Sequence, residues 1–279
     1  MIMNKFKKNF LEICRSALLL LLCVLMLLPF MWIFSTSLRL PKDSFKFPPD
    51  FFPTSFHIKN YATVFESFPF INFIFNSLFV GIVAGVFNIV VTTMAAFAFA
   101  RIRFKGRGPL FVIFLAGLMI PMQATIIPTF IIMSKVKLVG TLWALIIPAM
   151  ITPLSIFLVR QFMMTIPKSY EEAAYMDGAN RFLIYLKIIL PMSKSVIIMT
   201  SLINFLFNWN NFMGPLIYLS DWEKMTIPIG LRMLQGYQGT GSISVIFAGV
   251  FMSIVPALLL YLFGQKYLVK GAAISGLKS

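Results

Sequence analysis

Residues 171–179 read Glu-Glu-Ala-Ala-Tyr-Met-Asp-Gly-Ala, and residues 188–191 read Ile-Ile-Leu-Pro. This polar segment interrupts a chain of 279 residues, of which 59% are hydrophobic and only 12% are charged. Several runs of the chain approach or exceed the roughly 20 apolar residues that cross a bilayer. A soluble domain with so much apolar surface would aggregate. The sequence therefore predicts an all-α integral membrane protein with a polar element between two of its spans.

The polar segment, residues 167–191, carries the signals of two short helices and is called the docking loop below. Ser169 followed by Glu172 predicts a capping box, and Gly178 predicts the C-terminal cap of the first helix. A second helical run is expected to end at Pro191. Two short helices joined at a sharp turn can transmit the movement of a soluble partner to a membrane span. The alternative is an amphipathic segment that lies on lipid.

Six spans are predicted from the apolar runs, together with a short segment at each end of the chain. The first run is too long for a cleaved signal peptide, so we expect it to be retained as a span. The membrane domain is expected over residues 17–263, with an N-terminal segment 1–16 and a C-terminal tail 264–279. The six spans cover residues 17–36, 71–100, 110–133, 142–159, 195–219 and 243–263.

The lysine and arginine distribution predicts the orientation. If the N-terminus lies in the cytosol, the inner segments hold 16 of the 24 basic residues and the outer segments hold 8. This bias places both termini and the docking loop in the cytosol. The net charge of +15 is carried by segments that flank the spans. Without a basic stripe interleaved with exposed aromatic residues, no nucleic-acid partner is expected.

The spans as predicted contain no acidic residue and no lysine or arginine. Ionisable groups inside a membrane are the usual mark of proton relays, so proton coupling is disfavoured, whereas sodium coupling through backbone carbonyls stays open. The chain has no Gly-x-x-x-x-Gly-Lys-Ser/Thr loop for a nucleotide and no catalytic pair in a span. We expect a non-catalytic protein that itself binds neither cofactor nor metal.

The fifth predicted span carries three asparagines, Asn204, Asn208 and Asn211, which fall on one helical face. Two interpretations stay open. The asparagines either form a pore face that hydrogen-bonds a hydroxyl-rich solute or join helices through hydrogen bonds worth about 1 kcal/mol each. Gln123, in the third predicted span, is a lesser candidate of the same kind. These four residues are the candidate translocation path.

The docking loop resembles the EAA loop of ABC-importer permeases, in which Glu-Ala-Ala-x-x-Asp-Gly-Ala precedes Ile-x-Leu-Pro after eight residues. Further likeness to the MalG type of sugar permease lies in Asn76-Ser77, in residues 95–101, in Trp209-Asn210-Asn211-Phe212 and in residues 265–271. One departure is that the family often has Glu where this chain has Asn211. The docking-loop residues that the resemblance implicates in ATPase coupling are Glu171, Glu172, Ala173, Ala174, Asp177, Gly178, Ala179, Ile188, Leu190 and Pro191.

The resemblance implies the ABC type I importer permease fold, with cytosolic coupling helices, in a multi-pass protein of the bacterial plasma membrane. It implies import of a sugar, expected to be an oligosaccharide, driven by ATP hydrolysis in other subunits. The implied partners are a homologous MalF-like permease in a heterodimer, two cytosolic ATPase subunits that use ATP and Mg, and an extracellular solute-binding protein. The alternatives are a secondary carrier of a small polar solute and an ABC importer for a solute other than a sugar.

Overall fold

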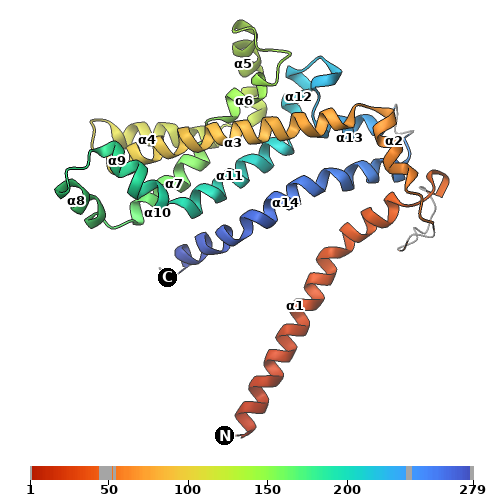
Figure 1. Cartoon of the computed structure of the whole chain (residues 1–279), viewed down its shortest axis with the longest axis horizontal. Coiled ribbons are helices and arrows are strands. Elements are labelled where there is room, and N and C mark those ends of the chain that lie inside the picture. The colour runs from red at the N-terminus through yellow and green to blue at the C-terminus, as the bar shows by residue number, and fades with distance from the viewer. Residues whose placement is uncertain (1, 44–51, 53–54, 237–240, 277–279) are drawn as a thin grey trace. The chain divides into compact units, whose positions relative to one another are not determined.

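The computed structural model describes residues 2–43, 52, 55–236 and 241–276, and within these residues every regular element is a helix. Figure 1 labels the helices in chain order. The chain divides into two compact units. One comprises Met1–Phe68 and Leu231–Met252, and the other comprises Pro69–Gly230 and Ser253–Ser279. The docking loop and all three candidate asparagines lie in the second unit, so this unit positions the site.

The first unit is built on α1 (Ile2–Ser37), a single long helix drawn in red in Figure 1. Its candidate span, Glu12–Ser37, is longer than the predicted 17–36 and buries none of its apolar window within the protein. Asn60 of α2 (Lys59–Ser67) ties that helix to the end of α1, because its Nδ2 donates to the carbonyl of Ser37 at 2.8 Å. Apolar side chains left open in this way fit a helix that lipid or a partner subunit covers.

The second unit is organised around α3 (Phe70–Arg101), which matches the predicted second span. It packs against α7 (Pro153–Thr165), α11 (Lys194–Trp209) and α6 (Trp143–Ala149). The buried face of α3 is rich in small and polar residues, as expected where helices approach closely in a membrane. At Gly81 an added Cβ would lie 2.6 Å from the ring of Phe205, so this glycine sets the approach of α11 to α3.

The third predicted span is not one straight helix. The chain forms α4 (Arg107–Ala116), the turn η2 (Gly117–Met119) and α5 (Met122–Lys135), and the axis bends by 105° between η2 and α5. The break falls at Pro121, which lacks an amide hydrogen and forces the preceding residue into an extended conformation.

The fifth span, predicted over residues 195–219, is also divided. Helix α11 ends at Trp209, and α12 (Met213–Tyr218) begins after a break of three residues. Asparagine side chains bond to the backbone at this break, and that of Asn211 takes the place of a helical partner. Asn210 Nδ2 donates to the carbonyl of Leu206 at 2.8 Å, and Asn211 Oδ1 accepts from the amide of Gly214 at 3.0 Å.

Two other spans run further than predicted. The fourth, predicted to end at residue 159, continues to Thr165 and so contains Arg160, which the prediction had placed outside the span. The guanidinium of Arg160 lies 4.0 Å from the ring centre of Phe111, and its Nε donates to the carbonyl of Phe99 at 3.1 Å. The sixth span belongs to α14 (Ile243–Gly276), which continues as helix into the predicted tail. Residues 277–279 of that tail lie outside the described residues.

By length and composition, four of the described helices could cross a membrane, or up to six if each of two bent pairs forms one span. One bent pair is formed by α4, η2 and α5. The other joins the helical run Arg181–Met192 to α11 through a bend of 76°. The protein is therefore a helical membrane protein with several spans, as the apolar runs predicted.

Candidate functional site

The first half of the docking loop folds as a short helix that ends at Gly178, as predicted. Helix α8 (Ser169–Met176) is followed by Gly178 in a left-handed conformation with φ +78°. The amide of Gly178 donates to the carbonyl of Tyr175 at 3.0 Å, and the amide of Ala179 donates to that of Ala174 at 2.9 Å. These two bonds form a Schellman cap, which closes the helix and turns the chain sharply.

The predicted capping box is wrong. Lys168 is the N-terminal cap residue of α8, its backbone is already helical, and no side chain caps the helix. Because the turn starts one residue earlier than predicted, Ser169 lies inside the helix and cannot cap it. The second helix, α9 (Arg181–Ile184), has the side-chain cap instead, since Asn180 Oδ1 accepts from the amide of Leu183 at 2.9 Å.

The second helical run is not a uniform α-helix and does not end at Pro191. It continues from α9 through the wider turn η3 (Tyr185–Ile189) into α10 (Leu190–Met192). The wider turn lets the helix pass the proline, which has no amide hydrogen to donate. The docking loop is thus joined to α11 by a helix with an irregular turn just before its final bend.

One side of the docking loop is anchored in an apolar cluster. Ala174, Ile184, Tyr185 and Ile189 are buried with residues of α3, α7 and α11. The Tyr185 hydroxyl also lies 2.8 Å from that of Thr93, a residue of α3. Partly buried side chains packed against this cluster include Ala179, Ile188 and Leu190.

The opposite side of the docking loop is open. The residues of the predicted coupling set that the structure leaves exposed are Glu172, Ala173, Asp177, Gly178 and Pro191. Helix α8 also exposes Tyr170, Tyr175 and Met176, so its open surface combines acidic, small and large apolar side chains.

An ion pair that was not foreseen holds the docking loop to α3. Arg101 Nη1 lies 2.9 Å from Glu171 Oε1, and the two side chains are only 5% and 13% exposed. Arg101 Nη2 donates to the carbonyl of Ile166 at 2.7 Å and also to that of Met163. Two features of the sequence could have revealed this ion pair. One is Arg101 at the end of an apolar run, and the other is Glu171, an extra carboxylate just before the Glu-Ala-Ala motif.

The predicted face of asparagines lines a cavity of about 170 Å³, called the asparagine cavity below. Asn204, Asn208 and Asn211 all contribute to it, whereas Gln123 is exposed and does not. The polar residues that join them in the lining are Thr125, Thr129, Thr152 and Tyr218. The lining contains no charged side chain.

The two interpretations of the asparagines apply to different residues. Asn204 is 2% exposed, and its Nδ2 donates to the carbonyl of Ala149 at 3.2 Å, so it joins helices. Asn208 Nδ2 donates to the backbone carbonyl of Asn204 at 2.8 Å, which leaves its own Oδ1 without a partner in the described part of the chain. Asn211 likewise has a free Nδ2, because only its Oδ1 is engaged. Asn208 and Asn211 therefore retain groups that could bind a solute.

A further asparagine, Asn88, was missed. It is 1% exposed on α3, and its Nδ2 donates to the carbonyl of Met150 at 3.0 Å and to Thr152 Oγ1 at 2.8 Å. These bonds engage the Met150 carbonyl and the Thr152 hydroxyl at the break between α6 and α7. Without Asn88, the carbonyl would be left unpaired in the membrane. Its position in the middle of an apolar span was the signal that could have found it.

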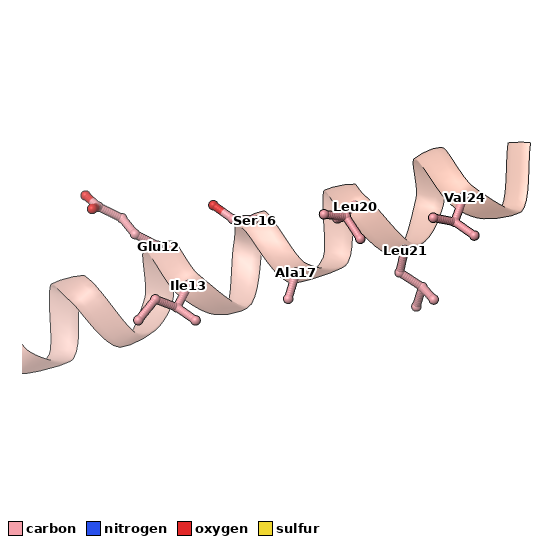
Figure 2. A pocket seen from close by; sticks show the side chains of 7 residues that line it. All are labelled: Glu12, Ile13, Ser16, Ala17, Leu20, Leu21 and Val24. Atoms are coloured by element: carbon pink, nitrogen blue, oxygen red, sulfur yellow. The ribbon is translucent and has the colours of Figure 1, made fainter. Parts of the chain in front are cut away.

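One hollow lies along α1 and does not form a site. It measures about 830 Å³, but all its lining residues come from one face of that helix (Figure 2). Two small residues, Ser16 and Ala17, make the notch, and Glu12 is its one charged group. Because this groove lies on the surface of a single helix, the lipid or protein that packs against the helix also fills the groove.

The comparisons with known proteins point to one family. Residues 88–271 match the family described as "Binding-protein-dependent transport system inner membrane component". The chain is 34% identical over 229 residues to the arabinooligosaccharides transport system permease protein AraQ of Halalkalibacterium halodurans, covering 82% of each chain. It is 30% identical over 257 residues to the diacetylchitobiose uptake system permease protein DasC of Streptomyces coelicolor, covering 90% of this chain and 91% of the relative.

The fold has a counterpart among solved structures. A chain of a bacterial ABC transporter involved in the import of the acidic polysaccharide alginate matches with a TM-score of 0.80. It is 24% identical and covers 93% of this chain and 96% of that one.

Proposed function

The chain belongs to the family of inner membrane components of binding-protein-dependent transport systems, and we propose that it is the permease subunit of an ABC importer that moves a sugar into the cell. The observation that carries this proposal is the docking loop, whose inner side is anchored to three helices and whose outer side is open. The permease names of two relatives, one of which mentions arabinooligosaccharides and the other diacetylchitobiose, support the sugar.

In this proposal the docking loop receives the motion of a cytosolic ATPase. Glu172, Ala173, Asp177 and Gly178 would contact that subunit, because they are exposed and close together on the outer side of the loop. Small side chains allow the close approach that such a contact needs. The displacement of the docking loop would pass along η3 and α10 to α11, which carries Asn204 and Asn208.

The assembly would contain further subunits. A homologous MalF-like permease would complete the membrane part, two ATPase subunits would use ATP and Mg, and an extracellular binding protein would deliver the sugar. Six spans, counting each bent pair as one, with both termini in the cytosol, would fit the lysine and arginine bias of the sequence. The chain would lie in the bacterial plasma membrane and would itself catalyse no reaction and bind no cofactor.

The asparagine cavity would form part of the sugar path. Asn208 Oδ1 is available to accept a hydrogen bond from a sugar hydroxyl, and Asn211 Nδ2 is available to donate one. Its volume of about 170 Å³ is below the roughly 300–1,000 Å³ of pockets that enclose a drug-sized ligand, so it would contact one part of an oligosaccharide at a time. The lining is mostly apolar with a few amides and hydroxyls and no charged side chain, which suits a neutral sugar better than a charged one.

Replacement of Gly178 by leucine tests the proposed coupling. The assembly, with its ATPases and binding protein, is reconstituted in vesicles, and ATP-driven uptake of a labelled oligosaccharide is measured. A bulky residue at Gly178 should abolish uptake, because it blocks the outer side of the loop. Gly140→Leu is a matched control, since both glycines have a positive φ, +78° and +82°, and no neighbouring atom near an added Cβ.

Two results would contradict the proposal. Uptake by the Gly178→Leu assembly equal to that of the Gly140→Leu assembly would exclude a coupling role for this turn. Uptake by the purified chain alone, without ATP or an ATPase, would instead identify a secondary carrier.

A further inference from the structure

Arg101 occupies the point where three helices of the second unit meet. It is the last residue of α3, and its side chain reaches the carbonyls of Met163 and Ile166, at and just beyond the end of α7. Its other terminal nitrogen contacts Glu171 in the first turn of α8. One guanidinium therefore joins the ends of α3 and α7 to the start of α8.

The two neighbouring glutamates of α8 have opposite surroundings. Glu171 shares the inner face of the helix with Ala174, three residues on, and its side chain is 13% exposed. Glu172 lies on the exposed side. The Glu-Glu pair thus divides into one carboxylate that is used within the chain and one that is open to a partner.

Helix α8 has few other attachments. Ala174 is its one buried residue, and the residues that join it to α7 include Ile166 in an extended conformation. A force applied to α8 could move this short helix alone. The non-helical segment that joins it to α7 would then bend, and the other helices would not be displaced. Glu171 Oε1 accepts no aligned hydrogen bond in the described part of the chain, so the attraction between the two largely buried charges, which solvent screens little, is what resists such a shift.

We propose that the Arg101–Glu171 ion pair is a latch that makes α8 move as one body with the ends of α3 and α7. Arg101 and Glu171 are positioning residues for the transport cycle, and the proposal rests on the coupling role of the docking loop. With the latch closed, displacement of α8 by an ATPase reaches α3 directly as well as α11. With the latch removed, part of that displacement is lost in motion of α8 alone.

The first test measures the position of α8 and does not depend on transport. Spin labels are placed on cysteines introduced at Met176 on α8 and Met94 on α3, which are 87% and 51% exposed, after Cys14 and Cys23 are replaced by serine. The full assembly is measured by pulsed electron paramagnetic resonance. The paired change Arg101→Met with Glu171→Met is used because it leaves no unpaired buried charge.

We expect a single narrow distribution of distances between the two spin labels when Arg101 and Glu171 are both present. The double variant Arg101→Met with Glu171→Met, called the Met pair, should give a broader distribution. Glu66→Gln is the control and should leave the distribution narrow, since Glu66 is exposed on α2 and lies outside both the latch and the docking loop. If the Met pair does not assemble, Glu171→Gln takes its place. A distribution that stays narrow without the ion pair would overturn the latch, whatever the chain transports.

The second test measures coupling as sugar imported per ATP hydrolysed by the reconstituted assembly. This ratio should fall by roughly 2- to 30-fold in the Met pair, the range seen for residues that carry coupling between sites. Glu171→Asp, which keeps the charge, should restore part of the loss, and the exposed Glu66→Gln should leave the ratio unchanged.

The two tests separate the latch from the proposed function. A broader distance distribution with an unchanged ratio would show that the ion pair positions α8 but transmits nothing, and would overturn the proposal. An unmodified assembly that imports no sugar at the expense of ATP would overturn the coupling role of the docking loop itself. The distance measurement would still report whether Arg101 holds α8.

Discussion

Replacement of Asn88 by leucine should destabilise the second unit by removing the support of the break between α6 and α7. The side chain is 1% exposed, and its Nδ2 donates at 3.0 Å to the carbonyl of Met150 and at 2.8 Å to Thr152 Oγ1. Side-chain hydrogen bonds between membrane helices are worth about 0.6–2 kcal/mol each. The carbonyl left unpaired adds a penalty of about 1–3 kcal/mol. We expect a total loss of about 2–7 kcal/mol.

The assay is unfolding of the purified chain in mixed micelles by a denaturing detergent, followed by circular dichroism. Asn72→Leu is the matched control, because Asn72 is an exposed asparagine of the same helix. Its free energy of unfolding should change by less than about 0.5 kcal/mol. If Asn88→Leu is as stable as Asn72→Leu, the inference that Asn88 supports the break is wrong.

Three further predictions concern helix approach, the cavity and the docking loop. Gly81→Ala should destabilise the protein by about 1–3 kcal/mol in the same assay, since its Cβ would lie 2.6 Å from the Phe205 ring, whereas Gly85→Ala meets no atom and should not. Asn208→Leu with Asn211→Leu should reduce uptake of a neutral oligosaccharide without lowering basal ATP hydrolysis; unchanged uptake would remove the cavity from the sugar path. Asn180→Ala should speed hydrogen exchange at the Leu183 amide about fivefold by removing its cap, and equal exchange rates would contradict that role.

The docking loop shows which local features can be predicted. Gly178 was correctly predicted to end the first helix, because a left-handed residue after a helix is a local requirement that glycine meets best. The capping box failed, because the start of α8 depends on how the chain arrives from α7. Asn204 and Asn208 were correctly placed on one helical face, since helical periodicity determines that relation, whereas Asn211 lies in the break after α11 and still lines the same cavity.

The breaks within the spans were harder to predict. Pro121 lay inside a predicted span, and a proline in a membrane helix is compatible with a mild kink as well as with the observed bend of 105°. Whether the helix kinks mildly or bends sharply depends on which neighbouring groups hydrogen-bond the backbone carbonyls that lose their helical partner at the proline. The end of α11 likewise depends on where the side chains of Asn210 and Asn211 find partners.

Apolar run length, helical period and a glycine cap act over a few turns of chain, so a helical membrane protein with a polar, two-helix loop of a transporter family could be predicted from the residues alone. The packing of the helices was needed to establish that Arg101 holds Glu171, that Asn88 supports a break 62 residues away, and that Gln123 lies outside the asparagine cavity. Such pairings join residues far apart in the chain. In a membrane, each buried polar group must find its partner among whichever helices the fold brings beside it.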